Sequence, residues 1–415
     1  MNYLDTNTLT INFDRMLKDD IYVDKSLLIE KINRMIGKRN CYVCITKPRR
    51  FGKTSNLTML GAYYTLGNDS KNLFNGLKIT QTNTFEEHLN QHHVIYIDFS
   101  RQPDNCPNYQ NYILSIQKGL KEDLEEAYPV LKEKNYDQIS RMLTDTKDQF
   151  IFILDEWDSI FYEEFTSDEN KKSYLKFLKG LLKDQPYVEL AYMTGVLPIA
   201  KYTTGSELNM FKEYNFMHDP IYEDFFGFSE EEVKELCKTY TSVSYEALAE
   251  WYNGYHKTDG TKLFNPRSVT NALSDGVCKN YWTETGPMNE IAEVIEHNVD
   301  AVREDIVQMV AGNPVEIELE GYGASQLQLN SRDEILSAMV VYGFLSYHAN
   351  ELRIPNKELM MKFEKVLKRD SMGAIAQIVN QSKEIFHATI NKDSERVAQY
   401  LEEVHDREIP FLVYN

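Results

Sequence analysis

The residues with the clearest chemical potential lie in TKPRRFGKTS, residues 46–55, which includes a Gly-Lys-Thr sequence. Phosphate groups bind backbone N–H groups that converge at a helix N-terminus, and Gly52 has no side chain to obstruct that approach. Lys53 would bring a mobile cation to the β and γ phosphates of a nucleotide, and the Thr54 hydroxyl would complete a magnesium shell. The predicted nucleotide-contacting residues are Pro48, Arg49, Arg50, Phe51, Gly52, Lys53, Thr54 and Ser55. The predicted ligands are therefore ATP and Mg²⁺.

The sequence around this loop has the order strand, loop, helix. The apolar run CYVCIT (residues 41–46) precedes the loop, and apolar residues at helical spacing follow from Thr54. One position departs from the usual phosphate-loop pattern, because Lys47 occupies the place of a glycine five residues before Gly52. A chance Gly-Lys-Thr at a basic helix start is the alternative, and the loop alone does not decide between the two interpretations.

An acidic pair downstream of the loop strengthens the nucleotide interpretation. Residues 149–156, QFIFILDE, place Asp155 and Glu156 directly after an apolar strand. Asp155 is predicted to hold magnesium together with Thr54, and Glu156 to orient or polarise the water that attacks the γ-phosphate. An acidic turn that caps a core strand is the alternative. Asp158 has two interpretations, a supporting role beside the site or an acidic first helical turn.

A third polar residue is expected at the same side of the sheet. The run VELAYMTG (residues 188–195) carries Thr194 at its carboxyl end, where a hydroxyl group would sense the γ-phosphate. Satisfying a local turn is the alternative role for this threonine. The predicted catalytic residues are Glu156, Lys53 and Thr194. Lys201 and Arg267 are isolated basic residues, for which solvated surface is the ordinary interpretation.

Four apolar runs predict the strands of one parallel sheet. They are residues 41–46, 93–100, 149–156 and 188–195. The stretches between them are long enough for helical crossovers, and near-continuous apolar strands that alternate with helices are typical of a sheet covered on both faces. The predicted fold class is therefore α/β, with a P-loop NTPase core over residues 1–225.

The pattern becomes helical after this core. Ser229 and Glu232 form a predicted capping box ahead of an apolar helix pattern, and Asn265 with Pro266 marks a further helix boundary. Residues 226–285 are therefore expected to form a helical lid.

The last predicted unit, residues 286–415, is helical and winged-helix-like. Its clearest part is residues 331–359, which are typical of a helix followed by a small β-hairpin. The basic residues of this stretch are Arg332, Arg353 and Lys357. Because they are few, a winged helix that contacts protein is favoured over one that binds nucleic acid.

Composition limits the classes of partner. The 415 residues carry a net charge of −19, which disfavours attraction of the whole surface to nucleic acid or anionic membrane. The sequence has no signal-peptide pattern and no run near the roughly 20 apolar residues that span a bilayer, so we expect a cytoplasmic protein without membrane contact. Five cysteines are typical of a reducing compartment. Cys41 and Cys44 lie in a strand-like run without a second pair at zinc spacing, which favours core positions.

With these residues assembled, the chain resembles the AAA-ATPase-like family of bacterial proteins, in which an ATPase module precedes a PD-(D/E)XK-type nuclease domain. The resemblance rests on YVDKS at 22–26, KPRRFGKTS at 47–55, FILDEWD at 152–158, TGVLPIAK at 194–201, ELNMF at 207–211, FGFSEEEV at 226–233, WYNGYH at 251–256 and FNPRSV at 264–269. The family's loop also lacks the first glycine, which accounts for Lys47.

The resemblance implies a P-loop core of AAA or STAND type with a helical lid, ATP as ligand, and Thr194 in a sensor position. It also implies that Asp155 and Glu156 form the Walker B pair. The last hundred residues or so contain no apolar strand bearing Asp followed by Glu-x-Lys, so we expect this chain to lack the nuclease domain and its activity.

Three functions follow as hypotheses. The first is a magnesium-dependent ATPase that acts as a regulatory or motor module for an attached or partner effector. The alternatives are a STAND-like nucleotide-binding switch or scaffold with little turnover, and a winged-helix nucleic-acid-binding module. The expected partners are ATP, a nuclease domain or DNA, and a second copy of the chain or another protein.

Overall fold

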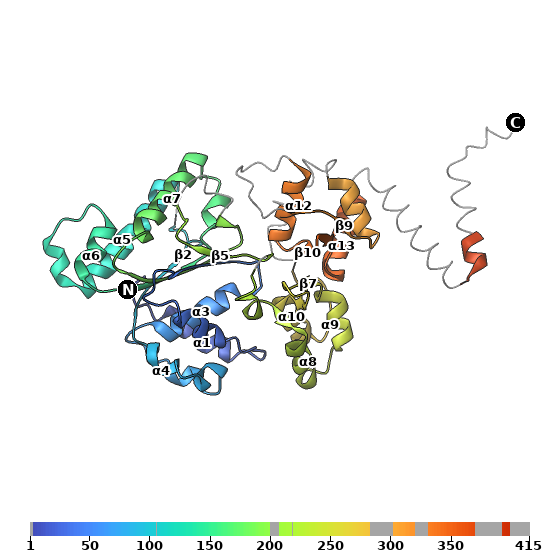
Figure 1. Ribbon diagram of the computed structural model, residues 1–415, viewed down its shortest axis with the longest axis horizontal. Helices are drawn as coiled ribbons and strands as arrows, with labels where there is room; N and C mark the ends of the chain where they lie inside the picture. Colours follow the sequence, from blue (N-terminus) through green and yellow to red (C-terminus); the bar gives the residue numbers. More distant parts are fainter. Residues whose placement is uncertain are drawn as a thin grey trace.

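The computed structural model describes residues 3–104, 106–199, 207–217, 219–282, 302–319, 331–369 and 392–398. Figure 1 shows a sheet-containing core, drawn from blue to green, beside two smaller parts drawn in yellow and orange. The chain thus passes from the core into the smaller parts after residue 219. The boundaries of the three predicted units stay a prediction.

The core is built on a five-stranded parallel sheet with the order β2-β3-β4-β1-β5. Its strands are β1 (Tyr42–Thr46), β2 (His93–Asp98), β3 (Phe150–Asp155), β4 (Val188–Gly195) and β5 (Lys212–Tyr214). The first four strands confirm the prediction from the apolar runs. The fifth was not predicted, because its three residues, Lys-Glu-Tyr, have no apolar run and only the tyrosine is buried.

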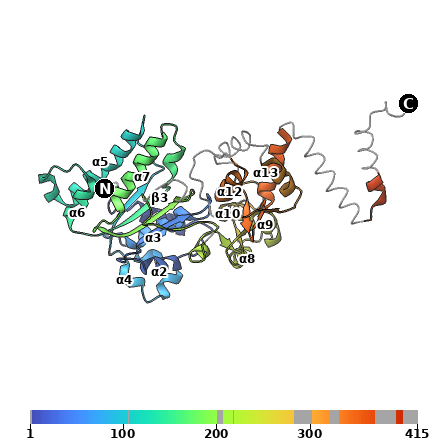
Figure 2. The same ribbon diagram turned by 45° about the horizontal axis from the view of Figure 1, so that its top comes forward.

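Helices cover both faces of this sheet, as expected for an α/β fold. Figures 1 and 2 show α5, α6 and α7 on one side and α3 and α4 on the other. The helices of the core are α1 (Thr8–Leu17), α2 (Leu27–Asn33), α3 (Lys53–Tyr64), α4 (Phe85–His88), α5 (Tyr109–Ala127), α6 (Ile139–Thr146) and α7 (Asp168–Leu182). Short 3₁₀ turns are η1 (Lys71–Phe74), η2 (Lys78–Gln81), η3 (Pro129–Glu133), η4 (Ser159–Tyr162) and η6 (Glu223–Phe225). Every residue of β3, an interior strand of the sheet, is buried, so this strand cannot shift without disturbing both faces.

The lid combines three helices with a small antiparallel sheet of order β6-β8-β7. Its elements are β6 (Phe228–Ser229), α8 (Glu230–Thr239), α9 (Tyr245–Tyr252), β7 (Tyr255–His256), β8 (Lys262–Phe264) and α10 (Pro266–Asp275). The predicted capping box of Ser229 and Glu232 is confirmed at the start of α8. Asn265 caps α10 and Pro266 is its first residue, also as predicted. The small sheet was not predicted, because its strands have only two or three residues each.

The C-terminal part contains helical residues 302–310 and a second antiparallel sheet of order β10-β11-β9. Its named elements are β9 (Val315–Glu316), α12 (Arg332–Val341), β10 (Ser346–His348), β11 (Glu351–Arg353) and α13 (Lys357–Arg369). The predicted helix followed by a hairpin is thus confirmed in α12, β10 and β11.

The three basic residues of residues 331–359 are each paired with a carboxylate. Arg332 pairs with Asp305 at 2.7 Å, Arg353 with Glu351 at 2.7 Å, and Lys357 with Glu250 at 2.8 Å. Pairing reduces the positive charge that this surface can offer to phosphate groups, which weakens the nucleic-acid interpretation of the winged-helix-like part.

The cysteines behave as core or surface thiols in the part of the chain that the structure describes. Cys41 and Cys44 are buried and free, and burial raises the pKa of both thiols. Within the same described residues, no group of three His, Cys, Asp or Glu side chains is arranged to hold a metal ion. No described helix has both the length and the apolar composition needed to cross a bilayer.

Gly254 should be the glycine whose replacement is most costly in the lid. Its φ is +101°, and an added Cβ would lie 1.9 Å from the carbonyl oxygen of Pro355. We expect Gly254→Ala to destabilise the protein by about 3 kcal/mol in urea unfolding followed by circular dichroism. Gly67→Ala is the matched control, since Gly67 has a φ of +81° but no atom within 4 Å of an added Cβ. That control should cost only about 1 kcal/mol, and equal costs for both would refute the backbone contact.

Acid should weaken the contact between the lid and the C-terminal sheet. The ring of His256 stacks on His348 with centroids 5.2 Å apart, and burial with the charges of His348, Lys262 and Arg353 lowers the pKa of His256 to about 4. A histidine with a lowered folded pKa contributes stability that is full above about pH 6.5 and is lost as pH falls toward 4. We expect His256→Gln to flatten the fall in urea midpoint between about pH 7 and pH 5. An unchanged pH profile in the variant would contradict this assignment.

Candidate functional site

The loop between β1 and α3 turns the chain from the sheet into a helix within six residues, 47–52. Arg50 has a φ of +70° and Gly52 a φ of +89°, so two left-handed residues lie close together. Gly52 is the N-cap of α3, and Thr54 and Ser55 are exposed in the first helical turn. The N–H groups of a first helical turn have no partner within the helix, so this turn presents donors outward.

The loop borders a cavity of about 1050 Å³. The predicted loop residues from Arg49 to Ser55 all line this cavity, as do Glu156 and Arg267. Further lining residues come from the lid, from residues 19–23 with Lys25, from η4 and from the C-terminal part. The structure therefore brings the predicted loop and the predicted acidic residue to one hollow. Lys201 lies outside the described residues.

Lys53 is buried and its ammonium group is held by the loop itself. Its Nζ donates to the carbonyl oxygens of Lys47 at 2.9 Å and Pro48 at 3.0 Å. Burial lowers the pKa of Lys53, while the negative charges of Glu156, Asp158 and Asp155 act in the opposite direction. The ammonium group of Lys53, which is predicted to contact phosphate, thus lies near the predicted carboxylates of Asp155 and Glu156.

Asp155 and Thr194 meet across the neighbouring strands β3 and β4. The Thr194 hydroxyl donates to Asp155 Oδ1 at 2.5 Å, and both side chains are buried. Burial raises the pKa of Asp155 to about 6, hydrogen bonds from Thr194 and Thr54 oppose this rise, and the charge of Glu156 adds to it. Thr54 and Asp155, the two residues predicted to hold magnesium, therefore lie near each other.

Glu156 follows directly after β3 with a φ of +51°, in the left-handed region. A glutamate in this region is strained, and such strain is commonly found at functional sites. Its backbone N–H donates to Asp155 Oδ1 at 3.1 Å, and the residue lines the cavity. The left-handed backbone at Glu156 therefore lets Asp155 stay buried in the sheet while Glu156 borders the cavity.

Asp158 supports the end of β4. It is buried, and its carboxylate accepts the backbone N–H groups of Val196 at 3.1 Å and Leu197 at 2.8 Å. This placement agrees with a supporting role beside the site. Gly195 was missed by the sequence reasoning, yet an added Cβ there would lie 2.4 Å from Trp157 and 2.5 Å from the Asp158 carboxylate. The sequence signal that was available for this close approach is the glycine directly after Thr194.

Three predicted loop residues also contact parts of the chain outside the core. Arg50 Nη1 donates to the carbonyl oxygens of Tyr281 at 2.9 Å and Trp282 at 2.5 Å. Phe51 is buried with its ring 5.0 Å from that of Tyr255. Pro48 lies against Gly343, where an added Cβ would come within 2.8 Å of it. The loop is thus fastened to the lid and to the C-terminal part, which local sequence patterns cannot reveal.

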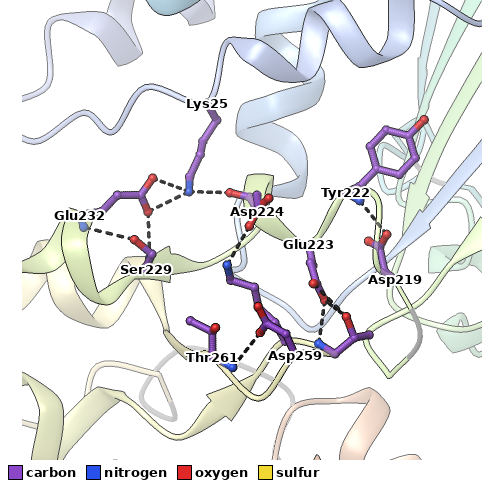
Figure 3. Close-up of polar contacts among 11 residues, drawn as sticks. Lys25, Asp219, Tyr222, Glu223, Asp224, Ser229, Glu232, Asp259 and Thr261 are labelled. Carbon is purple, nitrogen blue, oxygen red and sulfur yellow. Dashed lines mark hydrogen bonds and ion pairs between the residues drawn. The ribbon is translucent and has the colours of Figure 1, made fainter.

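A further wall of the cavity was not predicted. It consists of residues 19–23, Lys25, and Thr270, Asn271 and Ser274 of α10. Figure 3 shows Lys25 reaching Glu232 of the lid and the carbonyl of Asp224. The distances are 2.7 and 2.8 Å to the two Glu232 oxygens and 2.9 Å to Asp224. The motif YVDKS pointed to Lys25, but its partner lies too far along the sequence to be inferred.

Solved structures with a similar chain course have low sequence identity to this protein. A Walker-type ATPase of Pyrococcus abyssi has a TM-score of 0.39 and 13% identity, covering 84% of this chain and 99% of its own. The ORC2 protein of Aeropyrum pernix, solved as ADPNP–ADP complexes, has a TM-score of 0.42 and 13% identity, covering 86% and 98%. PCH-2 of C. elegans has a TM-score of 0.26 and 14% identity, covering 86% and 73%.

Comparison with family models finds a match for part of the chain. No curated protein matches the chain. The family model described as predicted AAA-ATPase matches residues 10–204, a range that includes the loop after β1, Asp155, Glu156 and Thr194. The core has the parallel α/β architecture that the sequence predicted. Residues 10–204, just under half of the chain, are thus similar to the family of predicted AAA-ATPases.

Proposed function

We propose that this protein binds ATP with Mg²⁺ at the loop between β1 and α3 and hydrolyses the γ-phosphate. The observation that carries the proposal is that Lys53, Thr54 and Glu156 line one cavity, while the buried carboxylate of Asp155 directly precedes Glu156 in the chain. A helix N-terminus, a buried cation and two carboxylates are the parts that phosphoryl transfer to water requires. The proposal thus rests on side chains from β3 and α3 that the sheet brings together.

The residues fit a magnesium ion. Thr54 offers a hydroxyl oxygen and Asp155 a carboxylate, both hard ligands of the kind that Mg²⁺ prefers. The two residues lie near each other, and a pKa of about 6 leaves Asp155 mainly ionised near neutral pH. When bound, the ion would neutralise charge on the β and γ phosphates.

Glu156 is the proposed group for water activation. Its carboxylate would accept a proton from the attacking water as the water oxygen bonds to the γ-phosphorus atom. The bond from that phosphorus to the bridging oxygen breaks, and ADP leaves with the electron pair. Lys53 and the N–H groups of the first turn of α3 would stabilise the charge that gathers on the phosphate oxygens, and Thr194 would sense the γ-phosphate.

Other lining residues of the cavity suit the base and ribose. Residues 19–23 include Ile21, Tyr22 and Val23, which supply apolar surface, and Asn271 of α10 supplies amide groups. Arg267 lies at the first turn of α10 and lines the same cavity, where its charge can reach a phosphate. Residues of α10 would thus contact the nucleotide in addition to the loop.

The proposal extends to a regulatory or motor role for an effector. Arg50 and Phe51 contact the lid, and Pro48 lies against Gly343 of the C-terminal part. A displacement of the phosphate loop would therefore be passed to both smaller parts. The effector is proposed to be a nuclease domain or DNA, reached through a second copy of the chain or a partner protein. The observation behind this extension is the set of loop contacts, and the coupling is testable without knowing the effector.

Replacing the proposed base should separate turnover from binding. We expect Glu156→Gln to lower magnesium-dependent phosphate release from ATP at least about 100-fold, because a glutamine cannot accept the proton. Binding of fluorescent ATP should remain. Glu164→Gln is the matched control, since Glu164 is exposed and does not line the cavity. Wild-type binding without any turnover would favour the switch or scaffold function instead.

Replacing the loop lysine should remove binding itself. We expect Lys53→Ala to weaken ATP binding at least about 100-fold in equilibrium titration, because the β and γ phosphates lose their cation. Circular dichroism must show that the variant is folded, since Lys53 also donates to two carbonyl groups. Lys118→Ala, an exposed lysine of α5, serves as control. Unchanged affinity in a folded Lys53→Ala protein would argue against this site.

A further inference from the structure

We propose that Lys47 and Asp219 form a positioning pair that fixes the phosphate loop against the start of the lid, so that nucleotide affinity depends on both residues. The inference rests on the proposed function, because it concerns how the same loop is held. Lys47 occupies the position where phosphate loops ordinarily have glycine, and glycine has no side chain with which to make such a contact. We call residues 219–229, which lead from the core into α8, the connecting segment.

The pair is buried and closely matched. Lys47 is 3% exposed and Asp219 1% exposed, and Lys47 Nζ lies 2.6 Å from Asp219 Oδ2. The same ammonium group donates to the carbonyl of Asn215 at 3.0 Å. Removing one partner of a buried ion pair leaves the other charge uncompensated, so these two residues constrain each other strongly. The contact joins positions 172 residues apart.

Lys47 is linked to the proposed chemistry through its backbone. Its carbonyl oxygen accepts the hydrogen bond from Lys53 Nζ at 2.9 Å, and its own N–H donates to the carbonyl of Gly195 at 3.2 Å. The residue therefore lies between the end of β4 and the cation of the loop. The Lys47 side chain therefore helps to fix the position of the Lys47 carbonyl oxygen, which accepts from Lys53.

Asp219 is linked to the lid through the connecting segment. Its Oδ1 accepts the backbone N–H groups of Tyr222 at 2.8 Å and Ile221 at 3.2 Å, which holds the turn that opens the segment. Figure 3 shows Asp219 with Tyr222, and next to them Glu223 and Asp224 in further polar contacts.

Those further contacts fasten the segment to the lid hairpin between β7 and β8. Glu223 accepts from the Thr258 backbone at 2.8 Å, and Asp224 pairs with Lys257 at 2.7 Å. One carboxylate, that of Asp219, therefore contacts the phosphate loop with one oxygen and the start of the connecting segment with the other. A shift of the loop would be passed to the lid through this residue.

The test is the double variant Lys47→Met with Asp219→Asn. The asparagine keeps an acceptor for Tyr222, and the methionine keeps much of the length of the lysine, so both charges are removed with little change of shape. We expect the KM for ATP to rise about 10-fold or more while kcat changes less than about threefold, because the loop binds phosphates both before and during the reaction. Hydrogen exchange should also show that ADPNP with Mg²⁺ no longer alters residues 219–229.

The matched control is Lys257→Met with Asp224→Asn, which removes an ion pair from the same connecting segment without touching the loop. Its KM should stay within about twofold of wild type. If the Lys47 and Asp219 double variant does not fold, Asp219→Asn alone should raise KM in the same direction. A folded double variant with lower thermal stability but unchanged KM and unchanged ADPNP response would overturn the positioning role of the pair and leave the proposed function in place. A wild-type protein that binds no nucleotide would overturn the proposed function with it.

Discussion

The turn that joins β1 to α3 has to present backbone donors to the cavity while containing two left-handed residues, Arg50 and Gly52. Such a turn keeps its shape only if its surroundings hold it. Lys53 donates to two carbonyl groups within the turn, and the Lys47–Asp219 pair holds one end of it. The ring of Phe51 packs against the rings of Phe216 and Tyr255. The placement of the lid and of the proposed chemistry both depend on this turn.

The sheet supplies the rest of the site by its register. β1 pairs with β4 so that Ile45 lies opposite Thr194, and β3 pairs with β4 so that Leu154 lies opposite Met193. Asp155 and Thr194 consequently reach the same edge as the loop after β1. In a parallel sheet, residues that follow different strands meet at the carboxyl edge, which is where ligands of α/β folds bind. Strand order therefore positions the acidic residues, which do not have to be close to the loop in the sequence.

Much of this could be predicted from the sequence because the signals were local. The four apolar runs gave the first four strands, and the capping residues Ser229 and Asn265 gave the starts of two lid helices. The strand β5 was missed because it is polar and three residues long. Lys47 was recognised as a departure from the pattern, but its partner Asp219 could not be found because ion pairs over such separations leave no local trace. Asn271 and the other α10 residues of the cavity were missed for the same reason.

The most direct measurement is a crystal structure of the protein grown with ADPNP and Mg²⁺. The account predicts phosphate density against the backbone of residues 52–55, with the ion beside Thr54 and Asp155 and the base between residues 21–23 and α10. Lys53 would then contact the β and γ phosphates. Density for the nucleotide at another surface, or none at saturating concentration, would contradict the central claim that this loop is the nucleotide site.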